Sequence, residues 1–298
     1  MIAPSYLKAG DKVAITCPAK KLPGDVKDAI KLLESWGLQV VLGDTVSASF
    51  HQYAGTDELR TKDLQRFLDD STIKAIFAAR GGYGTIRIID ALDFSAFIKT
   101  PKWIVGFSDI TVLHSHIYAN YQIQSIHGQM PLSIPDATKY SLETLRKALF
   151  GDELEYNYES APLNIPGTTR GILTGGNLSL LIALSGSVSE IDYKDKILFI
   201  EDVGEYLYSL DRMMWNLKRA GKLECLKGLV AGGFTGLQDN DIPFGKTAEE
   251  IIYEHVKDYG YPVCFNFPAG HIPDNHALVL GKEVHLNVDA ENVKLLIN

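Results

Sequence analysis

Short apolar runs alternate with amphipathic runs through the first half of the chain. Apolar residues at positions 26, 29, 30, 33 and 36 have the spacing of one helix face. The same reasoning predicts strands at 12–19, 39–42, 73–79, 103–107 and 124–127, and helices at 25–36, 57–68, 86–92 and 110–118. Strands that alternate with helices in this way favour a parallel sheet with helices on both faces.

The second half of the chain alternates less regularly. Residues 161–170, APLNIPGTTR, are rich in Pro, Gly and Thr and are interpreted as a linker. Beyond them the pattern predicts strands at 196–200, 226–234 and 262–267, helices at 209–220 and 247–259, and a tail that alternates as β-strands do. We therefore expect an N-terminal α/β domain over 1–160 and a C-terminal mixed α+β domain over 171–298.

Composition narrows the classes of function. The formal net charge is −8 and no basic run is present, which argues against nucleic acid or an anionic membrane surface as a partner. The three cysteines are scattered, without metal-binding spacing, and fit a reducing compartment. The first twenty residues lack the apolar core of a signal peptide, so a cytoplasmic protein is expected. No metal or cofactor is expected.

Ser108 lies where an apolar strand ends abruptly, in the stretch Lys102–Thr111, KWIVGFSDIT. Ligands of parallel sheets bind outside the carboxyl ends of the strands. A tight turn from strand to helix exposes a nucleophile there and directs helix N–H groups at its target. The alternative is that Ser108 only caps the following helix, as serine commonly does.

A glycine-rich loop, Arg80–Gly84, follows the preceding predicted strand. Glycines let backbone N–H groups approach a ligand, so the loop is suited to a phosphate or to an oxyanion. It lacks the patterns of a P-loop and of a dinucleotide-binding turn. A plain tight turn is the other interpretation.

An activated serine needs a base, and the base needs an orienting acid. His271 follows the predicted strand 262–267, and His127 is the rival base after another strand. Glu201 directly follows the apolar run ILFI and is a candidate for the acid, with an ordinary solvated loop end as the other interpretation. Asp202 and Glu205 beside it are equally compatible with surface charges.

Four motifs, in this order, resemble those of the LD-carboxypeptidase family of serine peptidases. They are ARGGYG at 79–84, VGFSDIT at 105–111, FIEDVGEYLYSLDR at 199–212 and PAGHIPDN at 268–275. The resemblance covers nearly the whole chain and implies a catalytic triad of Ser108, Glu201 and His271. It also implies an oxyanion hole made by backbone N–H groups of Asp109 and Gly82, and a homodimer.

The resemblance further implies hydrolysis of the bond between an L-centre, on lysine or diaminopimelate, and a terminal D-alanine of murein peptides. The D-alanine carboxylate needs a cation, for which Arg80 is the first candidate, with a structural ion pair as its alternative. Asp202 or Glu205 is the candidate for binding the substrate's distal amine. We assign two further positions to substrate binding, Tyr83 and Asn177, although Asn177 is also placed to cap a helix.

Two other functions compete with this interpretation. The microcin C immunity peptidases, in the same family, cleave peptidyl or acyl-sulfamoyl nucleotides and would need an aromatic surface for the nucleobase. A non-catalytic small-ligand binder is the alternative from another class, because two-domain α/β proteins with a cleft often bind solutes.

Overall fold

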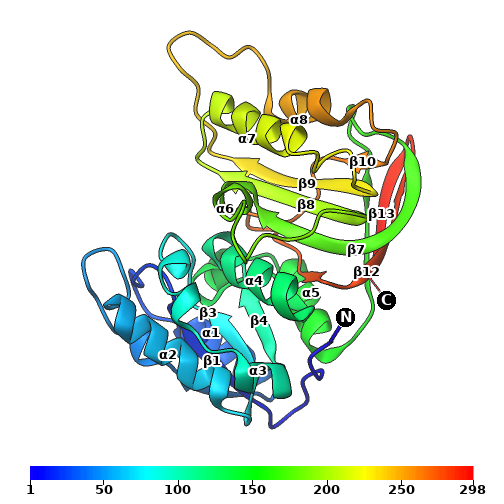
Figure 1. Ribbon diagram of the computed structural model, residues 1–298. Helices are drawn as coiled ribbons and strands as arrows, with labels where there is room; N and C mark the ends of the chain where they lie inside the picture. Colours follow the sequence, from blue (N-terminus) through cyan, green and yellow to red (C-terminus); the bar gives the residue numbers. More distant parts are fainter. Residues whose placement is uncertain (298) are drawn as a thin grey trace.

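The computed structural model describes residues 1–297 and contains two β-sheets, one above the other in Figure 1. The first sheet has six strands in the order β11-β5-β4-β3-β1-β2. Their bounds are β1 (Lys12–Thr16), β2 (Gln39–Leu42), β3 (Ile73–Ala78), β4 (Trp103–Gly106), β5 (Ser125–His127) and β11 (Leu278–Leu280). Strands β1 to β5 are parallel, so their carboxyl ends lie at one edge of the sheet.

Helices cover both faces of this sheet, as the alternation predicts. Val13 and Ile15 of β1 belong to the hydrophobic cluster that contains α1, whereas Ala14 between them belongs to the cluster of α2 and α3. The α-helices of this half are α1 (Lys27–Ser35), α2 (Asp57–Asp69), α3 (Ser95–Lys99), α4 (Thr111–Tyr121) and α5 (Lys139–Phe150).

Five short 3₁₀ helices connect these elements: η1 (Asp44–Val46), η2 (Thr85–Arg87), η3 (Ile89–Ala91), η4 (Ser108–Ile110) and η5 (Pro131–Asp136). The single helix predicted at 86–92 is wrong, because η2 and η3 occupy this segment instead. Over seven residues, apolar spacing does not separate a period of 3.6 from the 3.0 of a 3₁₀ turn.

The second sheet has seven strands in the order β10-β9-β8-β7-β12-β13-β6. Its bounds are β6 (Leu154–Glu159), β7 (Gly167–Asn177), β8 (Lys196–Val203), β9 (Gly228–Thr235), β10 (Val263–Cys264), β12 (Glu283–Val288) and β13 (Asn292–Ile297), with helices α6 (Leu178–Ala183), α7 (Leu207–Arg219) and α8 (Ala248–Val256). Strands β7 to β10 are parallel and the other pairs antiparallel, so this half is the expected mixed α+β unit.

The two sheets exchange strands across the expected linker at 161–170. β11 comes from the C-terminal half but pairs with β5, and β6 precedes the linker but pairs with β13. One hydrophobic cluster also contains Ile126 of the first sheet and Phe199 of the second. The shared core holds the carboxyl ends of both sets of parallel strands in a fixed relation, whereas the division into two domains at 161–170 stays a prediction.

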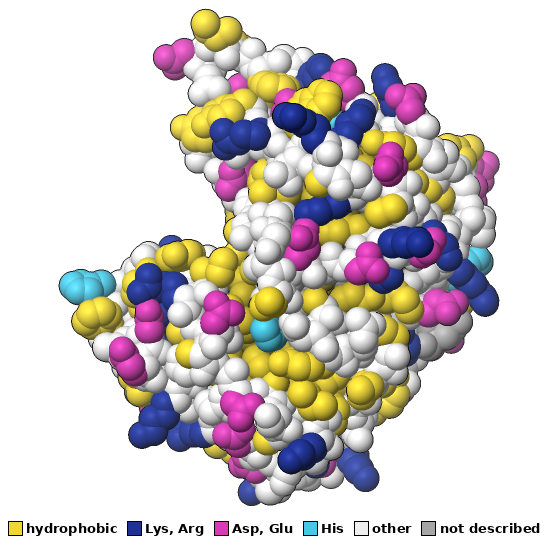
Figure 2. Space-filling model, in the orientation of Figure 1, with side chains coloured by type: hydrophobic (Ala, Val, Ile, Leu, Met, Phe, Trp, Pro, Cys, Tyr) yellow, Lys and Arg dark blue, Asp and Glu magenta, His cyan; other side chains and the backbone are white. Residues whose placement is uncertain are grey.

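The molecular surface in Figure 2 is notched between the two sheets and carries acidic and basic side chains intermixed on the face shown. Within residues 1–297, no helix has the length and apolar character needed to cross a bilayer.

Candidate active site

Ser108 lies at the junction of β4 and α4, in a backbone conformation that is unusual for serine. Its φ is +63°, in the left-handed region, and Gly106 before it has a φ of +158°. A non-glycine residue in this region costs about 1–3 kcal/mol, which surrounding structure must offset. The N-terminal caps of η4 and α4 are Phe107 and Ile110, so Ser108 is not the helix cap that its sequence context also allowed.

The glycine loop packs directly against this turn. An added Cβ on Gly81 would lie 2.9 Å from the Cβ of Ser108 and 3.1 Å from its Oγ. Gly82 has a φ of +112°, and its N–H donates no hydrogen bond within residues 1–297. Asp109 is the second residue of η4, and a helix start leaves such N–H groups without an internal partner. Two backbone donors therefore flank the serine.

The carboxylate of Asp109 fastens the serine turn to the glycine loop. Its Oδ2 accepts a hydrogen bond of 2.9 Å from the N–H of Thr85, at the start of η2. The side chain is completely buried, and burial raises the pKa of this carboxyl group. This contact holds the two segments that carry the backbone donors in one geometry.

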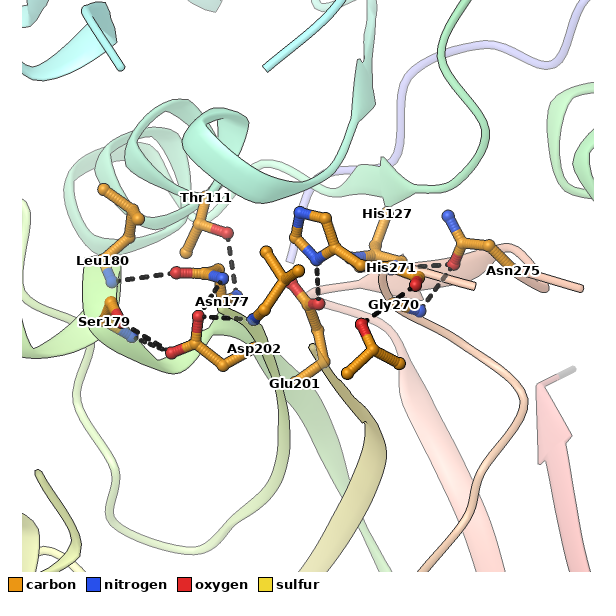
Figure 3. A network of polar contacts seen from close by, with 12 residues as sticks. Thr111, His127, Asn177, Ser179, Leu180, Glu201, Asp202, Gly270, His271 and Asn275 are labelled. Carbon is orange, nitrogen blue, oxygen red and sulfur yellow. Dashed lines mark hydrogen bonds and ion pairs between the residues drawn. The ribbon is translucent and has the colours of Figure 1, made fainter. Parts of the chain in front are cut away.

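A histidine–carboxylate pair from the second sheet faces the serine turn. Glu201, on β8, is completely buried, and its Oε2 lies 2.6 Å from Nδ1 of His271 (Figure 3). No hydrogen bond to Nε2 of His271 occurs in the described part of the chain, and the ring lines the same cavity as Ser108. The pair therefore has the arrangement of a base held by an acid.

The loop that carries His271 is packed closely against Glu201. Gly270 has a φ of +118°, and a Cβ added there would lie 2.9 Å from Oε2 of Glu201. Burial disfavours the charged imidazolium, but the hydrogen bond and the negative charge of Glu201 outweigh burial and raise the pKa of His271. The carboxylate of Glu201 thus raises the basicity of the His271 imidazole.

His127, the rival base, lies on the first sheet and serves a different purpose. It is completely buried, and burial lowers its pKa to about 3. Its Nε2 lies 3.1 Å from Oδ1 of Asn275, which also accepts the N–H of Gly270 at 2.8 Å (Figure 3). Since Oδ1 accepts from Gly270, His127 carries its proton on Nε2. His127 and the N–H of Gly270 both donate to Asn275, and these hydrogen bonds anchor the loop that carries His271.

Four of the sequence candidates line one cavity of about 450 Å³: Arg80, Gly82, Ser108 and His271. Glu201 lies behind His271 rather than on the cavity wall. A larger cavity, of about 610 Å³, lies over α2 and includes none of the candidate residues. The chemistry therefore points to the smaller cavity, which lies where the carboxyl end of β4 meets the second sheet.

Arg80 remains available to a ligand in this cavity. Its Nη1 donates to the carbonyl of Lys21 at 2.9 Å, and it forms no ion pair within residues 1–297. The structural ion pair considered as its alternative is therefore absent from the described part of the chain. Tyr83, by contrast, is exposed beside Tyr53 and is not part of the cavity wall.

The remaining substrate-binding candidates lie away from the cavity wall. Asp202 is buried and accepts four hydrogen bonds, from Asn177 Nδ2, Val203 N and both the N and Oγ of Ser179. Asn177 is also buried and caps α6 through Leu180 N (Figure 3). Glu205 accepts from Ser209 at 2.9 Å. These contacts organise the start of α6 and the turn before α7.

The structure adds residues to the site that sequence reasoning missed. Ser133 and Asp136 of η5 line the cavity beside Ser108. Gly81, which lies in the glycine loop already singled out from the sequence, packs against Ser108. No periodic or motif signal marks η5 in the sequence. Asn275, however, belongs to the segment PAGHIPDN that already pointed to His271, so its proximity was a usable signal. Within residues 1–297, no group of three or more His, Cys, Asp or Glu residues is placed to hold a metal ion.

The fold and the cavity together define a class: a two-sheet α/β protein with a serine on one sheet that faces a histidine and a buried carboxylate from the other. Residues 13–128 match the LD-carboxypeptidase N-terminal domain, and residues 170–286 match the LD-carboxypeptidase C-terminal domain. The chain therefore belongs to the LD-carboxypeptidase family.

Relatives and solved structures agree with this membership. A probable murein peptide carboxypeptidase of Bacillus subtilis is 34% identical over 95% of this chain and 91% of its own length. The murein tetrapeptide carboxypeptidase of Pseudomonas aeruginosa is 31% identical over 91% of each chain. The muramoyltetrapeptide carboxypeptidase of Oxalobacter formigenes superposes with a TM-score of 0.87 at 28% identity, covering 96% of this chain and 98% of that one.

The microcin C7 self immunity protein MccF, in complex with aspartyl sulfamoyl adenosine, has a similar fold. Its TM-score is 0.88 at 20% identity, covering 100% of this chain and 99% of that one. At that identity the likeness shows the fold alone, and a shared fold does not specify a substrate.

Proposed function

We propose that this protein is a serine LD-carboxypeptidase that removes the terminal D-alanine from murein tetrapeptides, in peptidoglycan recycling. The observation that carries the proposal is the Glu201–His271 pair, whose imidazole lines the same cavity as Ser108 and the glycine loop. The names of the relatives from Bacillus subtilis and Pseudomonas aeruginosa support the substrate class.

In the proposed reaction, Nε2 of His271 takes the proton of Ser108 as the hydroxyl attacks the carbonyl carbon of the L-centre. Glu201 holds the imidazole through Nδ1–H and stabilises the imidazolium that forms. The N–H groups of Gly82 and Asp109 bind the oxyanion. His271 then gives the proton to the departing amine of D-alanine, and water hydrolyses the acyl-enzyme by the reverse proton path.

Arg80 is the proposed partner of the D-alanine carboxylate. It lies in the glycine loop and lines the cavity of Ser108 without an ion-pair partner of its own within residues 1–297. A guanidinium in this place would favour substrates with a free C-terminus, as a carboxypeptidase requires.

The experiment that tests the proposal measures D-alanine release from a tetrapeptide ending in L-lysyl-D-alanine or diaminopimelyl-D-alanine. Ser108→Ala should lower kcat by roughly 10⁴–10⁶-fold while the unfolding temperature stays unchanged, because the strained φ remains and no capping hydrogen bond is lost. Turnover that survives this substitution would remove Ser108 as the nucleophile.

Peptidyl nucleotides remain the alternative substrate, and no specific observation favours them. Among residues 1–297, the aromatic rings of the cavity wall are the imidazole of His271 and the ring of Phe107. Phe107 is almost completely buried and packs edge-on against His271 at 5.0 Å between centroids. A nucleobase would need a more open platform. The cytoplasmic location and the homodimer stay predictions; light scattering of the purified protein measures the second.

A further inference from the structure

Asp136 supplies the carboxylate of the cavity that contains Ser108. It ends η5, and it also lines an adjoining cavity of about 240 Å³. The two cavities share four residues on their walls: Phe107, Ser133, Asp136 and His271. Asp136 therefore lies at the junction of the two cavities, next to His271. Arg80 lines only the larger of the two, from the glycine loop.

The charge of Asp136 is not used inside the protein. Its side chain is exposed, and within residues 1–297 it makes no ion pair or hydrogen bond. Other carboxylates near the site are committed: Glu201 to His271, and Asp202 to the start of α6. A ligand cation in this cavity thus meets one free carboxylate.

Asp136 is nevertheless carried on a fixed backbone. The N–H of Leu132, in the same 3₁₀ helix, donates to the carbonyl of Ala79 at 2.9 Å, next to the glycine loop. On the other side, the N–H of Thr138 and the side chain of Gln129 both donate to the carbonyl of Pro273, at 3.2 and 2.9 Å. The segment is therefore tied both to the oxyanion donors and to the loop of His271, which pre-organises its carboxylate.

We propose that Asp136 recognises the positively charged side chain of the residue that precedes D-alanine. This assignment rests on the proposed function. Among residues 1–297, the cavity wall then offers Arg80 as the cation for the carboxylate of the leaving residue and Asp136 as the anion for the amine of the acyl residue. The substrate class that fits is a peptide with a lysine-type side chain at the L-centre. The side chain of a diaminopimelyl residue ends in both an ammonium and a carboxylate. Its interaction with Asp136 should therefore be weaker than that of a lysyl side chain.

The test compares two tetrapeptides that differ in one charge, ending in L-lysyl-D-alanine or L-norleucyl-D-alanine. Wild type should prefer the lysyl peptide, and Asp136→Asn should lower kcat/KM for it by about 3- to 5-fold, mainly through KM, which is the upper part of the range for an exposed ion pair. The norleucyl peptide should be cleaved with kcat/KM changed by less than about twofold, since it has no charge for Asp136 to meet.

Asp241→Asn is the matched control. Asp241 is an exposed carboxylate in the loop between β9 and α8, outside both cavities, so it removes the same net charge at a distance. Its variant should keep the wild-type preference. Added salt should reduce the preference of wild type but leave Asp136→Asn unaffected.

Different results identify which assignment fails. If wild type cleaves both peptides and Asp136→Asn leaves their kcat/KM ratio unchanged, or lowers both equally, the role of Asp136 is wrong while the peptidase proposal stands. If a diaminopimelyl peptide depends on Asp136 more than the lysyl peptide does, the proposed preference for lysine is wrong. If wild type releases D-alanine from none of the three peptides, the proposed function is wrong, and the role assigned to Asp136 is wrong with it.

Discussion

Replacing Glu201 with glutamine is the sharpest test of the proposed triad. The side chain is completely buried, and its Oε2 lies 2.6 Å from Nδ1 of His271, so glutamine fits the same space without the charge. The amide would either donate to Nδ1, which forces the proton onto Nε2, or accept from it and leave its NH₂ group buried. In the first case His271 has no free lone pair for the proton of Ser108.

The size of the effect follows from this geometry. An imidazolium and a carboxylate whose charges are about 4 Å apart attract by about 4 kcal/mol at an effective dielectric constant of about 20. Loss of that stabilisation in the transition state corresponds to roughly 10³-fold in rate. The wrong tautomer adds to this, so a decrease in kcat of roughly 10³–10⁴-fold is expected.

The pH dependence of kcat/KM separates this role from a general loss of structure. The negative charge of Glu201 raises the pKa of His271 above its ordinary value of 6.5, although burial opposes it. Wild-type activity should therefore fall as the pH drops through a value above 6.5 and the base becomes protonated. Without the carboxylate, burial lowers the pKa of His271 and only the weaker charge effect of Asp202 opposes it, so the acidic limb of Glu201→Gln should lie at a lower pH than that of wild type.

Glu205→Gln is the matched control, because Glu205 lies four residues away, accepts from Ser209 and is not part of the cavity wall. It should keep its activity within about threefold and the acidic limb unchanged. If Glu201→Gln retained kcat within about tenfold of wild type, with the same acidic limb, Glu201 would not be the orienting acid.

Two further predictions concern packing and stability. Gly81→Ala places a methyl group 2.9 Å from the Cβ of Ser108, so kcat should fall about 10²-fold with the fold intact; Gly24→Ala, with no atom within 4 Å, is its control in the same activity assay. Asp202→Asn should instead lower stability by about 2–4 kcal/mol, because the amide cannot accept from all of its four donors, including both groups of Ser179. Thermal unfolding should show a decrease of roughly 5–10 °C with KM unchanged, and a raised KM at unchanged stability would restore Asp202 as a substrate ligand.

Most regular elements could be predicted from apolar patterns. Surface helices such as α1 bury one face and show helical spacing, whereas central strands such as β4 are buried on both faces and appear as short continuous apolar runs. The strand predicted at 39–42 coincides with β2, and the helix predicted at 57–68 differs from α2 by one residue. Periodicity was insufficient where elements are short, as at η2 and η3. It also could not reveal that β11 joins the first sheet, since a strand's partner depends on the whole chain's path rather than on its own residues.

The candidate site could be predicted from the sequence only in part. Ser108 and the glycine loop follow neighbouring parallel strands of the first sheet, which brings them to one edge. His271 follows a strand of the second sheet, so only the packing of the two sheets places it in the same cavity. Adjacent carboxylates were harder to separate: Glu201 contacts the imidazole, whereas Asp202 points to the opposite face of β8 and anchors α6. Successive side chains of a strand alternate between its faces, and only the structure assigns those faces.

The sequence by itself determined the class of fold, the family and the segments that carry the proposed chemistry, because these depend on local pattern and on motifs in order. The tertiary structure decided which charges face the cavity. Asp136 has no motif around it, yet the hydrogen bonds of its backbone segment to Ala79 and Pro273 bring it beside Ser108. Asp202 lies within a motif, yet four buried donors consume its charge. Whether a carboxylate is available to a substrate depends on neighbours that are distant in sequence, so composition and spacing do not determine it.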